Sequence, residues 1–322
     1  MGKRKRRYPR DEALYNLIQE NEIQMFVACL PGAVEAVLDR ETLWQGTGRP
    51  PARLRDILVC LVVKQYFDKS LRRSIGLLRL FKRVGLIDVE IPCFKTLGNY
   101  LNNGSIHVYL ERLIELTSAL FSAVDKYMAT DATGISTTCY SSWYSIRVCK
   151  KSRKRDHIMV HISVGTRSNV VVAHDVRGGK GGDNEILRSH VKRTDARGFE
   201  VEEWSGDKLY LTRDNCDAVA AIGAEPWFKL KSNTTALAKC SPAWRRMVLA
   251  FREDPDGSDE KYHRRSNVES TISAKKRKFA SRVRGRSTTS QRLEESVSWV
   301  GYNFSLVPRA YHEFSVKPPF GG

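Results

Sequence analysis

Three acidic residues stand at positions where carboxylates often do chemistry. Asp131 ends the apolar run Tyr-Met-Ala-Thr, and Asp207 follows Trp-Ser-Gly in a second stretch that we predict to be a strand. Glu269 lies in Arg-Arg-Ser-Asn-Val-Glu-Ser, which we predict to be helical. Each signal is weak alone, because an aspartate at a strand end usually caps a turn or meets solvent. Together, three carboxylates can hold divalent cations for phosphodiester chemistry.

Glu269 gives the sharpest signal, because its surroundings are basic. It is the only acid between positions 261 and 286, which hold ten basic residues: Lys261, Arg264, Arg265, Lys275, Lys276, Arg277, Lys278, Arg282, Arg284 and Arg286. A helix that only binds phosphate has no electrostatic reason to carry a carboxylate, which repels that ligand. A carboxylate that holds a divalent cation against a phosphodiester explains the pattern. The alternative, an i,i+4 pair of Arg265 and Glu269 on a solvated helix face, is worth roughly 0.2–0.5 kcal/mol and stays open.

Helical spacing places four side chains of this region on one face. At about 100° per residue, Tyr262, Arg265, Glu269 and Lys276 fall within a wedge of about 60°. That face offers an aromatic hydroxyl, a guanidinium fork, a carboxylate and an ammonium group. The guanidinium and the ammonium suit phosphate oxygens.

A second basic cluster falls at a turn between two expected strands. Six basic residues occupy nine positions there: Arg147, Lys150, Lys151, Arg153, Lys154 and Arg155. A solvated turn is the simple interpretation, but this density favours contact with a DNA backbone. The basic start of the chain, MGKRKRRYPR, is a further candidate arm on DNA.

The composition supports a polyanionic partner and excludes several other classes. The chain has 322 residues, with 54 Lys and Arg against 36 Asp and Glu, and a formal net charge of +18. This balance favours nucleic acid or an anionic membrane surface. The longest apolar run ends at Lys64, so we expect no membrane span. The seven cysteines are scattered without a C-x-x-C, and neither a disulfide framework nor a zinc site is expected.

The elements that must position these residues change character near position 123. Before it, helical periodicity dominates, and a helix-turn-helix within 70–100 competes with a plain helical bundle. After it, we predict strands followed by alternating strands and helices, which implies a mixed sheet with helices on its faces. The expected strands are 127–135, 143–148, 158–164, 170–176, 204–211 and 226–231. The expected helices are 183–190, 213–222, 242–252 and 263–279. Positions 253–260 read as an acidic loop.

Three segments in this order resemble a known family. The spacing Tyr262-x2-Arg265-x3-Glu269-x6-Lys276, within YHRRSNVESTISAKKRKF, resembles the third acidic motif and the Tyr-Arg-Glu-Lys signature of DDE insertion-sequence transposases of the cut-and-paste type. GDKLYLTRDNCDAVAAIGAEPWFKLKSN is similar to their second motif, and ATDATGIS to their first. GRPP with the apolar helix after it is similar to their amino-terminal region, so the likeness covers roughly residues 45 to 305.

The resemblance implies an α/β, ribonuclease H-like catalytic domain preceded by an all-α domain. It implies that Asp131, Asp207 and Glu269 are catalytic and bind two Mg²⁺ ions, with Mn²⁺ as a substitute. Tyr262, Arg265 and Lys276 would then bind DNA phosphates. We expect a helical DNA-end-binding domain at 1–122, the catalytic domain at 123–310 and a loose tail at 311–322. The implied partners are double-stranded DNA, as element ends and target, and a second copy in a homodimer on DNA.

The same resemblance implies a cytoplasmic, nucleoid-associated protein of prokaryotes. One departure is the span from Asp207 to Glu269, which is too short for the large β-strand insertion of some relatives. Two alternatives also remain open from the sequence. One is a catalytically silent DNA-binding protein derived from a transposase, and the other is a ribonuclease H-like nuclease without strand transfer.

Overall fold

The fold was analysed in a computed structural model that describes residues 11–38, 50–137, 157–178, 184–237 and 241–320. Five helices come first: α1 (Glu12–Val37), α2 (Leu54–Tyr66), α3 (Leu71–Arg83), α4 (Phe94–Asn103) and α5 (His107–Ala119). Then come β1 (Tyr127–Ser136), β2 (His157–Gly165), β3 (Val171–Gly178), α7 (Asn184–Ala196), β4 (Glu203–Gly206), the short 3-10 helix η1 (Lys208–Tyr210), α8 (Arg213–Ala221) and β5 (Glu225–Phe228). The chain continues with α9 (Pro242–Glu253), α10 (Pro255–His263), α11 (Ser266–Lys278), α12 (Thr288–Phe304) and α13 (Val307–His312).

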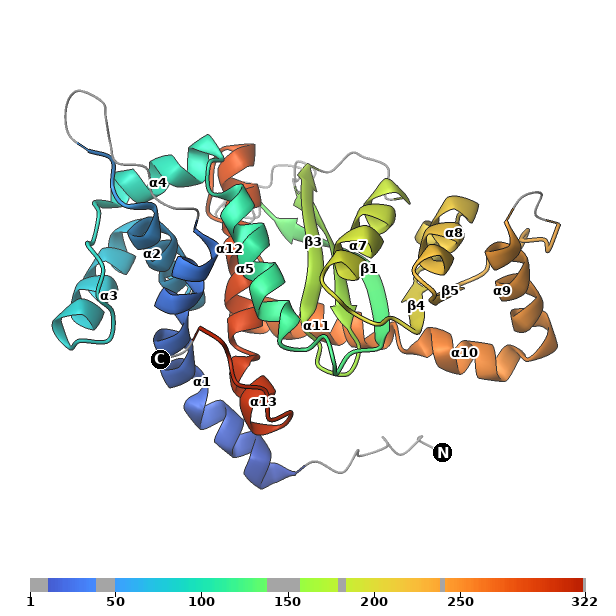
Figure 1. Cartoon of the computed structure of the whole chain (residues 1–322). Coiled ribbons are helices and arrows are strands. Elements are labelled where there is room, and N and C mark those ends of the chain that lie inside the picture. Colours follow the sequence, from blue (N-terminus) through green and yellow to red (C-terminus); the bar gives the residue numbers. More distant parts are fainter. Residues whose placement is uncertain (1–10, 39–49, 138–156, 179–183, 238–240, 321–322) are drawn as a thin grey trace, which may run out of the picture.

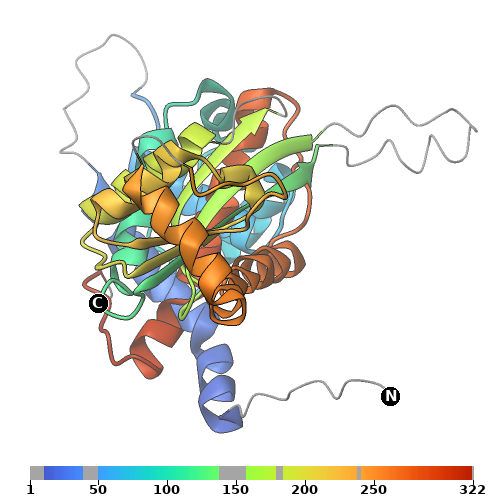
Figure 2. The same ribbon diagram turned by 90° about the vertical axis from the view of Figure 1, so that its right-hand side faces the viewer.

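The strands form one mixed sheet in the order β3-β2-β1-β4-β5. β1 pairs antiparallel with β2 and parallel with β4, and β4 pairs parallel with β5. Helices α7 and α8 lie over one face of this sheet, and α11 crosses the other (Figures 1 and 2). This α/β sheet with flanking helices, preceded by a helical region, confirms the predicted ribonuclease H-like fold class.

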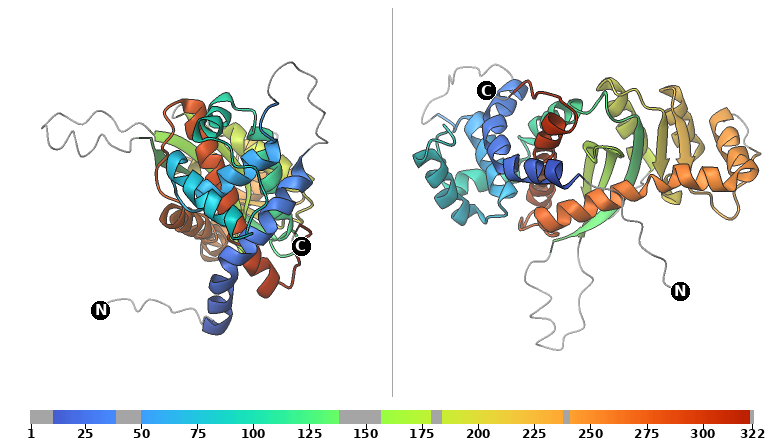
Figure 3. Two further views of the ribbon diagram at one scale, coloured as in Figure 1. Left: turned by 90° about the vertical axis from the view of Figure 1, so that its left-hand side faces the viewer. Right: turned by 90° about the horizontal axis from the view of Figure 1, so that it is seen from below.

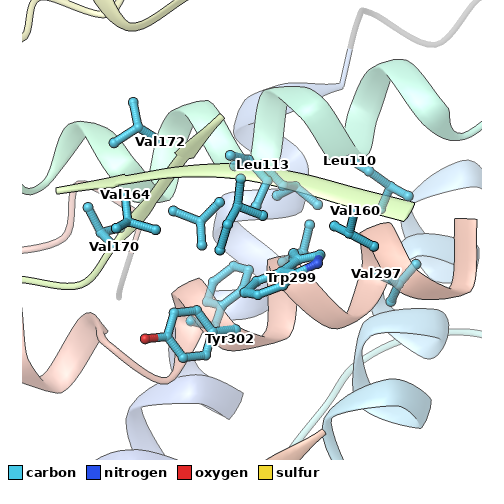
Figure 4. Close-up of a cluster of buried hydrophobic side chains, with 14 of the residues drawn as sticks. Leu110, Leu113, Val160, Val164, Val170, Val172, Val297, Trp299 and Tyr302 are labelled. Atoms are coloured by element: carbon cyan, nitrogen blue, oxygen red, sulfur yellow. The ribbon is translucent and has the colours of Figure 1, made fainter. Parts of the chain in front are cut away.

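Helix α12 joins the helical region to the sheet. It contacts α2, α4 and α5 on one side and β3 on the other, so it runs between them (Figure 1). Figure 4 shows the resulting core, where Leu110 and Leu113 of α5 meet Val160 and Val164 of β2 and Trp299 of α12. The first helices and the sheet therefore share one continuous apolar core, although they are far apart in the sequence.

Most expected elements of the second half lie close to their predicted positions, and the exceptions have local causes. The strand predicted for 204–211 ends at Gly206, and Asp207 begins η1 by accepting a hydrogen bond from the Lys208 N–H. The acidic stretch expected to be a loop forms α10, because Asp254 caps its first turn and Pro255 fits its first position. The strand predicted for 143–148 lies outside the described residues.

The end of the chain is packed rather than loose along part of its length. α13 extends to His312, and residues 313–320 form neither helix nor strand. Phe320 is nevertheless buried, and its ring meets Phe304 edge-to-face. Its carbonyl oxygen lies so close to α1 that a Cβ at Gly32 would stand 2.4 Å from it. Gly32 thus allows the tail to dock on α1.

Candidate active site

β1 sends alternate side chains to opposite faces of the sheet, and this alternation aims Asp131 at α11. Thr130 points to the α7 side, where its hydroxyl accepts a hydrogen bond from the Trp204 indole and contacts the Ser163 hydroxyl. Asp131 points the other way, and its Oδ2 accepts a hydrogen bond of 2.8 Å from Nη1 of Arg265. Its Oδ1 accepts a bond of 2.9 Å from the Ala132 N–H.

Parallel pairing brings Asp207 to the same edge of the sheet. Thr130 of β1 is opposite Gly206, the last residue of β4, in the ladder, so Asp131 is followed across the sheet by Asp207, which comes directly after β4. Neighbouring strands lie about 4.8 Å apart. Asp207 is half-buried, and its Oδ1 accepts a hydrogen bond of 2.6 Å from the Lys208 N–H.

Glu269 reaches this edge from α11 through a shared guanidinium. Arg265 donates from Nη1 to Asp131 and from Nη2 to Oε1 of Glu269, the latter at 2.6 Å. Burial raises the pKa of Asp131, and the charges of Asp207 and Glu269 add to that rise, although Arg265 opposes it. Burial disfavours the charge on Arg265, but the surrounding acids outweigh burial and raise its pKa. The three predicted acids thus interact electrostatically around one arginine.

α10 and α11 run almost end to end along this side of the sheet (Figure 3, right). Arg264 and Arg265 separate them but keep right-handed helical dihedral angles, with φ near −55° at both. Tyr262 lies on α10, and the guanidinium of Arg265 is 5.8 Å from the centroid of the Tyr262 ring. Lys276 lies further along α11 and donates to the Thr133 hydroxyl at 2.6 Å. Burial lowers the pKa of Lys276, with a further contribution from the charge of Lys275.

Two residues of this edge were not singled out by the sequence. Lys229 directly follows β5, and its ammonium lies 5.0 Å from the centroid of the Tyr262 ring and 2.9 Å from Oδ1 of Asp259. Thr133 lies within the ATDATGIS segment and is the hydrogen-bond partner of Lys276. The sequence offered one signal for each residue: Lys229 comes near the end of an expected strand, and Thr133 comes two residues after Asp131. The basic cluster 147–155 lies outside the described residues.

The donor set suits a hard divalent cation by its chemistry, since all three predicted ligands supply carboxylate oxygens. Within the described residues, however, no group of three or more His, Cys, Asp or Glu side chains lies close enough to hold a metal ion. Asp131 and Glu269 instead share Arg265, and Asp207 joins them through its charge. One oxygen of Asp131 and one oxygen of Glu269 are thus held by Arg265 in this arrangement.

Comparison with known proteins identifies the class of this fold and site. Residues 124–298, more than half of the chain, match the family model described as the transposase DDE domain. The chain therefore belongs to the DDE transposase family. Among solved structures, it is similar to a piggyBac transposase in a synaptic complex with hairpin DNA. The TM-score is 0.42 with 10% identity, over 95% of this chain and 76% of that one.

Among curated proteins, none matches the chain. Its family membership thus depends on the family model. In the part of the chain that the structure describes, no helix is both long and apolar enough to cross a membrane.

Proposed function

We propose that the chain binds the terminal inverted repeats of an insertion sequence, cleaves the ends and transfers them to target DNA. The observation that carries this proposal is the meeting of Asp131 and Glu269 on one guanidinium, with Asp207 directly after the neighbouring parallel strand. A strand, the residue directly after its neighbouring strand, and a helix supply these acids from 131 to 269 in the chain. A solvated Arg265–Glu269 pair on a surface helix would not need Asp131 as a third partner.

Asp131, Asp207 and Glu269 are proposed to bind two Mg²⁺ ions, or Mn²⁺ in their place. Bound there, such ions lower the pKa of water or of a DNA 3′-hydroxyl and stabilise the leaving oxygen of an in-line displacement. Asp131 is on the central strand of the sheet, shares Arg265 with Glu269 and is next to the strand that precedes Asp207, so it is the best placed to be shared. No protein nucleophile is needed for this chemistry.

Arg265, Lys276 and Tyr262 are proposed to bind the phosphates near the scissile bond. Arg265 donates one hydrogen bond to each of two carboxylates through separate nitrogens, and two oxygens of a single phosphate would accept from the same two nitrogens in a bidentate pair. A phosphate that takes one of these positions frees a carboxylate oxygen. Lys276 is held beside β1 by Thr133, which places its ammonium along the same face as Asp131.

The remaining parts of the proposal concern the partners and the division of the chain. Residues 1–122, with their basic arm, would bind the DNA ends, and 123–310 would carry the catalysis. Arg147, Lys150, Lys151, Arg153, Lys154 and Arg155 would contact the DNA backbone. Two copies would act together on a pair of ends, in a cytoplasmic, nucleoid-associated complex of a prokaryote. The net charge of +18 supports a partner with many phosphates.

Replacing Glu269 by Gln tests the catalytic assignment. The variant keeps the shape of the side chain but removes the charge that binds a cation, so Mg²⁺-dependent cleavage of a labelled duplex of the DNA that flanks the coding sequence should be lost. Binding of that duplex should stay equal or tighten, because a charge that repels phosphate is gone. Glu260→Gln, also exposed and on the neighbouring α10, is the matched control and should cleave normally.

Other outcomes of this experiment would support one of the two alternative functions, a silent DNA-binding protein or a nuclease without strand transfer. Retained cleavage by folded Glu269→Gln would overturn its catalytic role. A wild-type chain that binds the duplex but never cleaves it with Mg²⁺ or Mn²⁺ would be a silent DNA-binding protein. Cleavage without joining of the ends to a target plasmid would indicate a nuclease.

A further inference from the structure

The first part of the chain contains a helix-turn-helix, at a different place from the one that the sequence indicated. α2 and α3 contact each other and are joined by only four residues, 67–70, in which Asp68 adopts a left-handed conformation with φ of 46°. A turn of three to four residues is typical of this motif. Within 70–100, by contrast, α3 and α4 are joined by residues 84–93, which is too long.

The two helices differ in the way that this motif requires. From Asp56 to Tyr66 every residue of α2 is buried, so α2 is a packing element. α3 buries only Ser74 and Leu78 and leaves its opposite side in solvent. In DNA-binding versions of the motif, the second helix lies in the major groove. α3 is that second helix.

Three arginines form a stripe along the outward side of α3. Counted from Leu71 at about 100° per residue, Arg72, Arg79 and Arg83 fall within roughly 40° of one another. All three are exposed, and α3 carries no acidic residue. The guanidinium of Arg72, however, lies over the ring of Phe94 in α4, 4.1 Å from its centroid, whereas Arg79 and Arg83 have no aromatic contact among the described residues. No ion pair joins any of them to a residue that the structure describes, whereas Lys82, on another side of α3, pairs with Glu90 at 2.7 Å. The stripe therefore presents three cations that have no carboxylate partner among the described residues.

Gly76 lies between Arg72 and Arg79 along this stripe, and nothing in the fold requires a glycine at this position. A Cβ added there would meet nothing within 4 Å, and its φ is not positive, so neither packing nor backbone conformation requires glycine. In a helix interior, glycine costs about 1 kcal/mol relative to alanine. A missing side chain between arginines is useful to a partner whose surface must come close to the helix.

We propose that the outward face of α3, formed by Arg72, Gly76, Arg79 and Arg83, docks into the major groove of duplex DNA. The arginines would flank the groove and bind phosphates or guanine edges, and Gly76 would let the helix approach closely. This assignment rests on the proposed function, because it names the surface that holds the element end. A second copy of this chain is a poorer occupant, because both copies carry a net charge of +18.

The test measures the affinity of the full chain for a duplex of the DNA that flanks the coding sequence, over a series of salt concentrations. Gly76→Gln changes no charge and has open space in the fold, so it should keep or raise the melting temperature. It should nevertheless weaken binding by more than about tenfold. Val108→Gln, at an exposed position of α5, is the matched control and should bind normally.

The arginines are tested in the same assay. Arg79→Gln and Arg83→Gln should each weaken binding and lower the slope of log K against log salt by about 1, as expected for one lost phosphate contact. Lys82→Gln removes the same charge from another side of α3 and should leave the slope nearly unchanged, since Lys82 already has Glu90 as a partner.

The outcomes separate this assignment from the proposed function. If the wild-type chain cleaves the duplex and all α3 variants bind it normally, the assignment to α3 is overturned and the transposase proposal stands. If the wild-type chain binds neither this duplex nor others, the proposed function fails first. Two further outcomes would also overturn the assignment. In one, the wild-type chain is a dimer without DNA and the Gly76→Gln variant is a monomer. In the other, Gly76→Gln weakens binding to anionic vesicles but leaves binding to DNA unchanged.

Discussion

Two groups of ion pairs between basic and acidic side chains lie in opposite environments in this protein. At the candidate active site, Arg265 joins Asp131 and Glu269, and Glu269 remains 56% exposed. On the other side of α11, Lys275 pairs with Glu295 of α12, and both side chains are at most 2% exposed. A neighbouring pair, Lys64 with Glu294, ties α2 to α12 and is also buried.

This difference shows which ions can exchange partners. Water and ligands reach the pairs at Arg265, so a phosphate or a cation can replace one member there. The pair of Lys275 and Glu295 is sealed. Lys64 and Glu294 are also buried but line a small pocket, where Glu294 accepts hydrogen bonds from the backbone N–H groups of Arg284 and Gly285. Successive residues of one helix, Lys275 and Lys276, thus serve the two environments, because one faces α12 and the other faces β1.

Breaking a sealed pair should have the largest effect on stability. Glu295→Ala leaves the Lys275 ammonium buried without its carboxylate, so the free energy of unfolding should fall by about 3–5 kcal/mol. Urea or thermal denaturation measures the loss. The double variant Lys275→Met with Glu295→Leu should recover much of it, because neither position then buries a charge. A loss below about 1 kcal/mol in the single variant would contradict the sealed environment.

Acid should lower the stability of the fold through a third buried group, which lies on the other face of the sheet. His190 of α7 contacts Asp175 and Ser163, with Arg193 and His174 nearby, and burial lowers its pKa to about 4. The unfolded chain binds that proton at a pKa of about 6.5. The free energy of unfolding should therefore fall as the pH drops from about 6.5 to about 4, by up to about 3 kcal/mol.

Unfolding curves at several pH values measure this dependence. His190→Asn removes the titrating group, so its stability should depend less on pH in that range than the stability of the wild-type chain. Equal slopes for the two chains would show that His190 is not the group responsible.

The smallest stability effect is expected at the candidate active site itself. Glu269→Gln breaks a pair with an exposed partner, so the free energy of unfolding should change by well under 1 kcal/mol. The same denaturation experiment as for Glu295→Ala gives the comparison. A loss as large as that of Glu295→Ala would mean that the carboxylate of Glu269 serves the fold, and the contrast between the two groups would disappear.

Local patterns predicted much of the second half of the chain. Apolar and β-branched runs marked β1, β2 and β3, and amphipathic spacing marked α8, α9 and α11, because both signals depend on residues close in sequence. The end of β4 was wrong, since Asp207 caps a 3-10 helix where an extended strand was expected. The helix α10 was missed although Asp254 and Pro255 are ordinary start signals, because the acidic residues suggested a loop.

The sequence by itself determined the family, and it predicted the three acids and a common face for Tyr262, Arg265 and Lys276, because such predictions depend only on spacing within a helix or motif. Only the tertiary structure decided that Asp131 and Glu269 share Arg265, since that contact depends on how α11 crosses β1. It also decided that Lys275 is sealed by α12 while Lys276 reaches β1. Such pairings join residues far apart in the chain, and local patterns carry no information about which distant surface each side chain will face.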